Sequence, residues 1–179
     1  MKICYLLTRS DALGGVQIHI RHLAKKMAEE GHEVTIIVGG TGVYYEMLLE
    51  NGCNVISIES LKKEINIFSD TLAFFQLLIC LIRVKPDLIS IHSSKAGVIG
   101  RVASFILRIP SVFTAHGWSF TDGISKRKQY IYSKIEGAMS YLCERIITVS
   151  DYDHMLAIER KIIAPERLVT VHNGMPKIP

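Results

Sequence analysis

The chain has 179 residues, 49% of them hydrophobic and 21% charged, and its 21 Lys and Arg against 17 Asp and Glu give a formal net charge of +4. This composition predicts one globular domain and excludes a disordered or low-complexity chain. The basic residues are spread out except at 126–128 and 160–161, and no nucleic-acid-reading motif accompanies them. We therefore expect no nucleic acid among the partners.

The cysteines and the apolar runs indicate the compartment. The four cysteines lie far apart without a C-x-x-C pair, and the first residues suit a strand better than a secretory leader. The longest apolar run, residues 72–84, is interrupted by Gln76 and Arg83 and is shorter than the roughly 20 residues that a bilayer span needs. We expect reduced thiols, a cytoplasmic location and no spanning helix.

Short β-branched runs alternate with helical patterns from end to end, which is typical of repeated βαβ units. The expected strands are residues 2–7, 33–38, 54–58, 88–92, 111–115, 145–149 and 168–172. Several of these runs are apolar on both faces, as in strands that helices cover on each side. The sequence predicts one α/β, Rossmann-like domain with an open, mostly parallel sheet of about seven strands and helices on both faces.

The clearest helix follows the first strand. Val16, Ile20, Leu23 and Met27 recur at helical spacing, and Gly31 can supply a left-handed stop. Further helices are expected at residues 43–50, 70–84, 96–107, 126–143 and 151–162. Residues 117–125 contain turn residues without a period and predict a long loop at the carboxyl end of a strand.

Polar residues follow several expected strands at their carboxyl ends, where ligands bind in an open parallel sheet. Gly14 and Gly15 precede a helix amino terminus, whose free N–H groups and dipole favour a phosphate, although a tight turn alone would explain them. Ser94 and Lys95 follow the fourth strand and offer a hydroxyl and a cation. A helix cap and a solvated lysine are the alternatives for these two residues.

His116 ends the fifth strand and is followed by Trp118, the only tryptophan, and Phe120. A histidine beside aromatic rings suits hydrogen bonding and stacking with a sugar. The alternative is a packed loop that the two rings anchor. Ser150 and Asp153 fit a helix-capping pair.

The sequence lacks the motifs of several common enzyme classes. The G-x-G-x-x-G fingerprint, the phosphate loop, the G-x-S-x-G nucleophile elbow and paired carboxylates are all missing from the sequence. His19 and His22 share one helix face, but no cysteine or carboxylate cluster completes a site around them. We expect no metal and no cofactor.

Five segments stand out in order along the chain: residues 14–17 with 31–34, 85–89 with 92–97, 114–120, 147–150 and 171–175. Taken together they resemble the amino-terminal half of a bacterial family 4 glycosyltransferase with the GT-B architecture, in the subgroup that builds capsule, exopolysaccharide or O-antigen units. The resemblance covers the whole chain. It implies that residues 1–179 form the acceptor-side domain and that the donor-binding carboxyl-terminal domain is absent.

The resemblance implies a retaining hexosyltransferase. Such an enzyme moves a sugar from a nucleotide-sugar donor to a lipid-linked or saccharide acceptor in cell-surface polysaccharide synthesis, without an obligatory metal. Because the donor-binding domain is missing, we expect residues 1–179 alone to be inactive.

Site residues also follow from the resemblance. His116 would be the catalytic residue at the reaction centre. The donor diphosphate and sugar would be approached by Gly14, Gly15, Ser150 and Asn173. The acceptor would be held by Gln17, Ser94, Lys95, Trp118 and Phe120.

Other functions stay open at the level of sequence. One is a non-catalytic ligand- or partner-binding Rossmann-like domain, and another is half of a GT-B nucleotide-sugar epimerase. The basic and aromatic residues 126–132 suggest docking on the anionic inner face of the cell membrane. A solvated helix end is the alternative for that segment.

Overall fold

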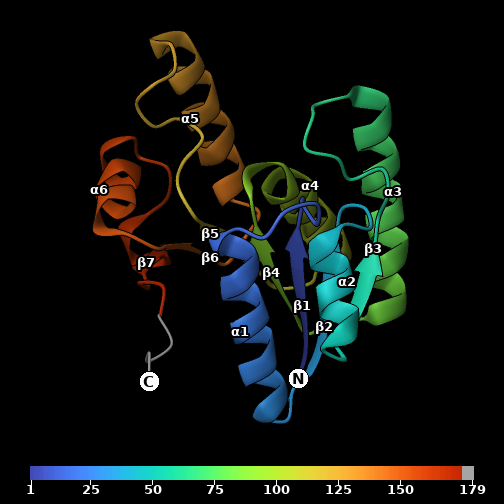
Figure 1. The fold of residues 1–179 in the computed structure, drawn as a ribbon. Helices are drawn as coiled ribbons and strands as arrows, with labels where there is room; N and C mark the ends of the chain where they lie inside the picture. The colour runs from blue at the N-terminus through green and yellow to red at the C-terminus, as the bar shows by residue number, and fades with distance from the viewer. Residues whose placement is uncertain (175–179) are drawn as a thin grey trace.

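One parallel sheet of seven strands runs through the computed structural model, which describes residues 1–174 (Figure 1). Its strands are β1 Lys2–Leu7, β2 Glu33–Val38, β3 Asn54–Ser57, β4 Leu88–His92, β5 Ser111–Ala115, β6 Arg145–Thr148 and β7 Leu168–Thr170. The order across the sheet is β3-β2-β1-β4-β5-β6-β7, and every neighbouring pair is parallel. The predicted fold class is therefore confirmed.

Six α-helices and one 3-10 turn connect the strands in the described part of the chain. They are α1 Gly15–Glu29, α2 Val43–Glu50, α3 Ile67–Val84, α4 Ser94–Leu107, α5 Lys126–Ser140, α6 Asp151–Glu159 and η1 Pro165–Arg167. Every helix expected from the sequence is present. Gly31 takes the left-handed φ of 86° that its place after α1 predicted.

The start of α3 differs from the prediction by three residues. The helix begins at Ile67 rather than at residue 70, because the Asn66 side chain caps it by accepting hydrogen bonds from Phe68 N and Ser69 N, both at 3.1 Å. The resulting 18-residue helix has a mean hydropathy of 1.8, and only 22% of it is buried. By length and composition alone the helix could cross a membrane, which the shorter run 72–84 did not indicate.

Other predicted ends ran too long. The helices expected at 126–143 and 151–162 end at Ser140 and Glu159, and three strands end one or two residues early. After α6 the chain turns because Lys161 takes a left-handed φ of 52°. These ends depend on local turns that the hydrophobic period does not reveal.

The core consists of two clusters, one on each face of the sheet. Alternate residues of β1 point to opposite clusters: Tyr5 packs with α1 and α2, while Leu6 packs in the cluster that includes α3, α4 and α6. Figure 1 shows α1 and α2 in front of the sheet and α4 behind it. The strands are thus buried on both sides, as their continuous apolar runs predicted.

The neighbouring strands β1 and β4 form the switch point of the sheet. The helices that follow them, α1 and α4, pack into the clusters on opposite faces. In open α/β sheets a crevice forms at this place, beyond the carboxyl ends of the strands. The candidate site should therefore lie around the residues that follow Leu7 and His92.

A buried ion pair joins α4 to α5. Arg101 is fully buried, and its Nη2 donates to Glu136 Oε2 at 2.6 Å. Its Nε donates to the Gly97 carbonyl at 2.7 Å, and its guanidinium carbon lies 4.3 Å from the centre of the Phe113 ring. A buried charge of this kind is tolerated only while its partner is present.

Replacing one partner of this pair should destabilise the domain strongly. We expect Glu136→Leu to lower the free energy of unfolding by about 3–5 kcal/mol, because it leaves the Arg101 charge uncompensated. Adding Arg101→Met should recover most of the loss. Urea unfolding of each variant measures both effects.

A matched surface pair is the control. Lys26 on α1 and Glu30, the residue that follows the helix, are exposed and 3.6 Å apart, so Glu30→Gln should change stability by no more than about 0.5 kcal/mol. Equal effects of Glu136→Leu and Glu30→Gln would contradict the assignment.

Candidate functional site

Two hydroxyl groups, one after β1 and one after β4, form a hydrogen bond across the switch point. Thr8 Oγ1 lies 2.7 Å from Ser93 Oγ and accepts a hydrogen bond from Ala96 N, so a residue after β1 caps helix α4. Thr8 N also donates to Ser93 Oγ at 3.3 Å. Ser93 takes a φ of 72° that is unusual for a residue with a side chain. The carboxyl ends of β1 and β4 are thereby fixed to one another.

Three histidines from different elements meet beside this point. His92 at the end of β4, His116 after β5 and His19 on α1 have ring centres 5.2 to 6.5 Å apart. His92 Nδ1 lies 2.9 Å from His116 Nε2, and His92 Nε2 lies 3.0 Å from Ser90 Oγ. His116 therefore lies at the carboxyl edge of the sheet, where the sequence placed it.

The histidines are held neutral. Burial, with repulsion from His19, lowers the pKa of His116 to about 4, although Asp153 acts in the opposite direction. Burial also lowers the pKa of His92 well below its usual value, with added repulsion from His116 and His19. The pKa of His19 is lowered by burial and by His22. At neutral pH the cluster is thus a set of hydrogen-bonding groups, not of charges.

The hydrogen-bond chain favours one tautomer of His116. The only side-chain partner found for the Ser90 hydroxyl within residues 1–174 is His92. If Ser90 donates to His92 Nε2, then His92 Nδ1–H donates to His116 Nε2, and His116 keeps its proton on Nδ1. The reverse direction would leave the buried Ser90 proton without an acceptor, which costs energy. We infer that His116 presents Nδ1–H as a donor.

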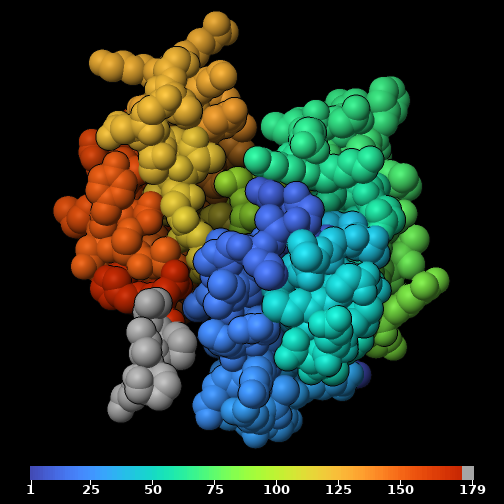
Figure 2. All heavy atoms as spheres, in the orientation of Figure 1, coloured from blue at the N-terminus to red at the C-terminus, as the bar shows by residue number. Residues whose placement is uncertain are grey.

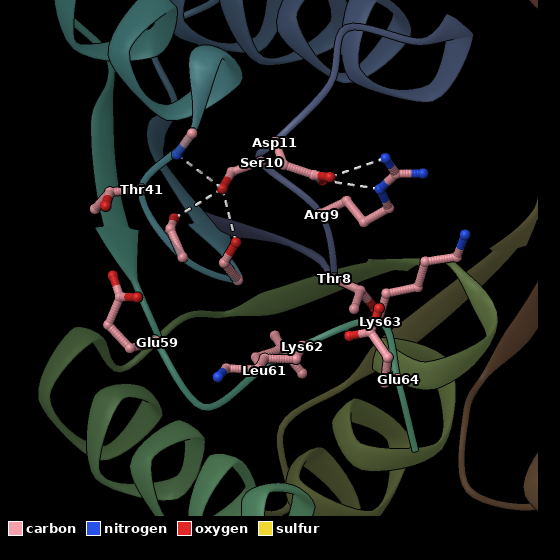
Figure 3. Close-up of a pocket in the computed structure, with 13 residues that line it drawn as sticks. Thr8, Arg9, Ser10, Asp11, Thr41, Glu59, Leu61, Lys62, Lys63 and Glu64 are labelled. Carbon is pink, nitrogen blue, oxygen red and sulfur yellow. Dashed lines mark hydrogen bonds and ion pairs between the residues drawn. The ribbon is translucent and has the colours of Figure 1, made fainter. Parts of the chain in front are cut away.

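A polar pocket opens at Thr8, the residue that contacts Ser93. It has a volume of about 260 Å³ and lies between the loops that follow β1, β2 and β3 (Figure 3). Arg9, Lys62 and Lys63 contribute cations to its wall, and acidic groups come from Asp11, Glu59 and Glu64. Arg9 already pairs with Asp11 at 2.8 Å. The pocket therefore offers hydrogen-bonding and charged groups suited to a polar ligand.

Ser10 holds the loops of this pocket together. Its hydroxyl donates to the carbonyls of Gly39 and Gly40 at 2.7 and 2.8 Å and accepts from Gly42 N at 3.2 Å (Figure 3). A side-chain carbon at Gly39 would lie 1.9 Å from the Leu61 carbonyl oxygen. Glycine is therefore required there for the loops to approach one another.

The first helix start matches its expected role as an open amino terminus. Gly14 is the N-cap residue and provides no side-chain cap, and a side chain at Gly15 would meet only open space. Gln17, in contrast, is buried: its Oε1 accepts from Gly14 N and its Nε2 donates to the Arg9 carbonyl. Gln17 supports this loop from within, so its position gives no support to an acceptor contact.

Of the two candidate residues after β4, one is free to contact a ligand and the other is bound within the domain. Ser94 is exposed in the first turn of α4 and remains free to contact a ligand. Lys95 pairs with Asp70 and donates to the Glu64 carbonyl, which ties α4 to the start of α3. In this structure Lys95 is neither open to a ligand nor fully solvated, because its ammonium group binds Asp70 and the Glu64 carbonyl.

The aromatic residues after β5 are part of the core. Trp118 is 4% and Phe120 1% exposed, their rings stack with centres 5.0 Å apart, and Trp118 Nε1 donates to the Asp153 carbonyl. The predicted alternative of a packed loop describes this segment. Because both rings are buried, they cannot stack on an acceptor, and the prediction that they do so is corrected.

The remaining donor-side candidates lie at the far end of the sheet. Ser150 Oγ accepts from Asp153 N at 3.1 Å and lies 2.6 Å from Asp153 Oδ2, so it caps α6 as the capping pattern predicted. Its hydroxyl is therefore used inside the domain. Asn173 is exposed beyond β7. Met175, the end of the fifth resembling segment, lies outside the described residues.

Sequence reasoning missed several groups that the fold brings together. Ser90, His92 and Thr8 were not assigned roles, although His92 ends a strand just as His116 follows one. The pairing of His92 with Thr114 across β4 and β5 is what places the two imidazoles side by side. The described residues contain no group of three or more His, Cys, Asp or Glu side chains that could hold a metal ion.

The family comparison covers nearly the whole chain. The family model for Glycosyltransferase Family 4 matches residues 13–176. A curated relative in Escherichia coli, the UDP-Gal:alpha-D-GlcNAc-diphosphoundecaprenol alpha-1,3-galactosyltransferase, is 24% identical over 91% of this chain and 42% of its own length. The O-antigen biosynthesis glycosyltransferase WbnH of Escherichia coli is 26% identical over 98% of this chain and 49% of its own. The chain thus spans less than half the length of these relatives.

Solved structures share the fold. Anabaena HepE in complex with UDP and glucose matches 98% of this chain and 45% of its own, with a TM-score of 0.79 and 19% identity. The UDP-GlcNAc 2-epimerase from Methanocaldococcus jannaschii matches 97% of this chain and 46% of its own, with a TM-score of 0.69 and 12% identity. At these identities the likeness concerns the fold alone.

Acidification should destabilise the domain through the histidines. A group whose pKa is about 4 in the folded state and 6.5 in the unfolded state gives stability that is present above pH 6.5 and lost as the pH falls toward 4. For His116 the loss between pH 7 and pH 5 should be about 2 kcal/mol. Urea unfolding at several pH values measures it. His116→Asn should flatten the dependence, and an unchanged slope would contradict the prediction.

The tautomer of His116 can be observed directly. In long-range ¹H–¹⁵N spectra at pH 7 we expect His116 to show a protonated Nδ1. Ser90→Ala should shift this preference, because it removes the donor that orients His92. The exposed His22 serves as the internal control. A protonated Nε2 in His116 of the unmodified protein would refute the inferred direction of the chain.

Proposed function

The chain belongs to glycosyltransferase family 4, and from this premise we propose that it is the amino-terminal, acceptor-side half of a retaining glycosyltransferase. The complete enzyme would move a sugar from a nucleotide-sugar to a lipid-linked or saccharide acceptor in cell-surface polysaccharide synthesis. The observation that carries this proposal is the family match over residues 13–176, combined with a neutral histidine at the carboxyl edge of the sheet. The names of the relatives, with UDP-galactose and a lipid diphosphate in one of them, support the substrate classes.

His116 would act as a hydrogen-bond donor to the transferred sugar. A histidine with a pKa of about 4 is a weak general base at neutral pH, so deprotonation of the acceptor is not its role. During transfer the bond from the anomeric carbon to the diphosphate oxygen breaks, and a bond to the acceptor oxygen forms. The acceptor proton passes to the leaving diphosphate. Catalysis would then rest on positioning and on stabilising the developing charge.

The amino terminus of α1 would face the donor. Its first-turn N–H groups lack a side-chain cap, and the space beside Gly15 is open, so a diphosphate held by a second domain could approach the backbone closely. Asn173 would lie on the same donor side. We assign no metal or cofactor to this reaction, following the family resemblance.

The acceptor would occupy the pocket behind the β1, β2 and β3 loops. Arg9, Lys62 and Lys63 offer cations for phosphate oxygens, and Glu59 can accept hydrogen bonds from sugar hydroxyls. Ser94 lies exposed at the start of α4 and could add a hydroxyl. Thus the acceptor residues proposed here come mainly from loops and not from the aromatic segment after β5.

Two alternatives are less well supported. An epimerase half shares the fold, but the family model matched by the sequence is that of a glycosyltransferase. A non-catalytic binding domain would need no second domain. The proposed transferase needs a donor-binding domain as a partner, which separates the two experimentally.

The test uses the two-domain protein obtained by extending the coding sequence downstream. We expect it to transfer sugar from a UDP-sugar to a lipid-diphosphate saccharide, and His116→Ala to lower kcat by about 10²- to 10³-fold, as loss of one well-placed donor does. Product analysis by mass and by NMR of the anomeric signal measures transfer and retention. Added EDTA should leave the rate unchanged.

The matched control is His22→Ala, an exposed histidine on the same helix as His19, which should keep full activity. Residues 1–179 alone should turn over far more slowly than the two-domain protein. Comparable rates for the two would refute the half-enzyme, and nucleotide-sugar epimerisation without any acceptor would favour the epimerase.

A further inference from the structure

Helix α3 is largely apolar on its outer side as well as its inner side, yet the domain covers only the inner side. Ala73, Leu77, Cys80 and Leu81 are buried in the core cluster that contains α4. A soluble helix normally places polar residues on its outer side. Here the outer side carries large hydrophobic residues instead, so something other than this domain is expected to cover it.

The exposed hydrophobic side chains form one straight line. Phe68, Leu72, Phe75, Ile79 and Ile82 follow one another at spacings of four and three residues, which keeps them on one face over about 21 Å. Ile67, the first residue of the helix, and Ile65, which precedes it, add exposed apolar surface at the amino end. The most exposed members, Ile65 and Phe68, are 85% and 84% exposed. We call these seven residues the α3 ridge.

Basic residues stand at both ends of the α3 ridge. Lys62 and Lys63 precede it, and Arg83 and Lys85 follow it, all of them exposed. Asp70 is paired with Lys95, and the exposed acidic groups nearest these four cations are Glu59, Glu64 and Asp87. None of the three stands among the apolar residues of the α3 ridge between Ile67 and Ile82. An apolar line bracketed by cations is complementary to a lipid surface with anionic head groups.

A second basic group lies on the same side of the molecule. The amino end of α5 carries Lys126, Arg127 and Lys128, with Tyr130 exposed beside them. The tips of α3 and α5 project beyond the carboxyl edge of the sheet on either side of the loop that follows β1 (Figure 2). The segment 126–132 therefore adds charge at the same edge of the sheet as the amino end of the α3 ridge, across the β1 loop from it, and it does not provide the apolar surface.

We propose that the α3 ridge lies in the surface of an anionic lipid bilayer, parallel to the membrane plane. Crossing the bilayer is excluded by the packing of its other side against α4 and the sheet core. The ridge starts at Ile65, directly after Lys62, Lys63 and Glu64, which line the polar pocket. Resting on the proposed function, this places the pocket where a lipid-linked acceptor could enter it from the membrane.

Vesicle co-sedimentation of residues 1–179 tests the proposal without donor or acceptor, so its outcome does not depend on transfer activity. The protein should bind phosphatidylcholine vesicles that contain phosphatidylglycerol. Ile67→Ser with Phe68→Ser should weaken binding by roughly tenfold for each side chain, at high as well as low salt. Neutralising Lys126, Arg127 and Lys128 to Gln should weaken it only at low salt.

The matched control is Phe105→Ser with Ile106→Ser, two exposed apolar residues at the end of α4, which should bind as the unmodified protein does. Equal thermal unfolding of all variants shows that they fold. Absence of binding to anionic vesicles at low salt would overturn the proposal, and so would unchanged binding by the Ile67 and Phe68 variant. A dimer in sedimentation velocity that this variant dissociates, without vesicle binding, would assign the ridge to a second copy of the chain.

Discussion

The contact between Thr8 and Ser93 is the constraint on which the site depends. It joins the first residue after β1 to the first after β4 and gives α4 a cap from outside its own sequence. Because α1 and α4 then leave on opposite faces, the carboxyl ends of β1, β4 and β5 open toward the same space. The histidine cluster and the polar pocket both lie around this joint, so their geometry follows from it.

The sheet could be predicted well because its strands are buried on both faces. The runs 2–7, 33–38, 88–92 and 111–115 are continuous and apolar, and the structure reproduces their bounds. Ends that depend on one residue, through its side chain or its backbone angle, could not be predicted in the same way. Asn66 caps α3 and Lys161 turns the chain after α6, and neither changes the hydrophobic period.

The candidate site was harder to predict than the fold, because strand ends supply groups both for ligands and for the domain itself. Gln17 and Lys95 bind backbone carbonyls, and Trp118 fills the core, although each has the chemistry of a ligand contact. The role of His92 depends on the register of β4 with β5, which no local pattern specifies. The residue types therefore indicated that the site lies at the carboxyl edge of the sheet. Which side chains remain free for a ligand depends on their partners inside the domain and on the register of the strands.

The inner and outer sides of α3 are both hydrophobic, but they have different surroundings. Its inner side stabilises the sheet, and Lys95 anchors its first turn through Asp70, so the helix is held rigidly against α4. A rigid helix presents its outer side chains in one plane, which suits a flat lipid surface better than a flexible loop would. Lys95, which holds α3 through Asp70, follows Ser94 at the start of α4. A membrane contact along α3 would therefore fix the distance of the pocket and of His116 from the lipid surface.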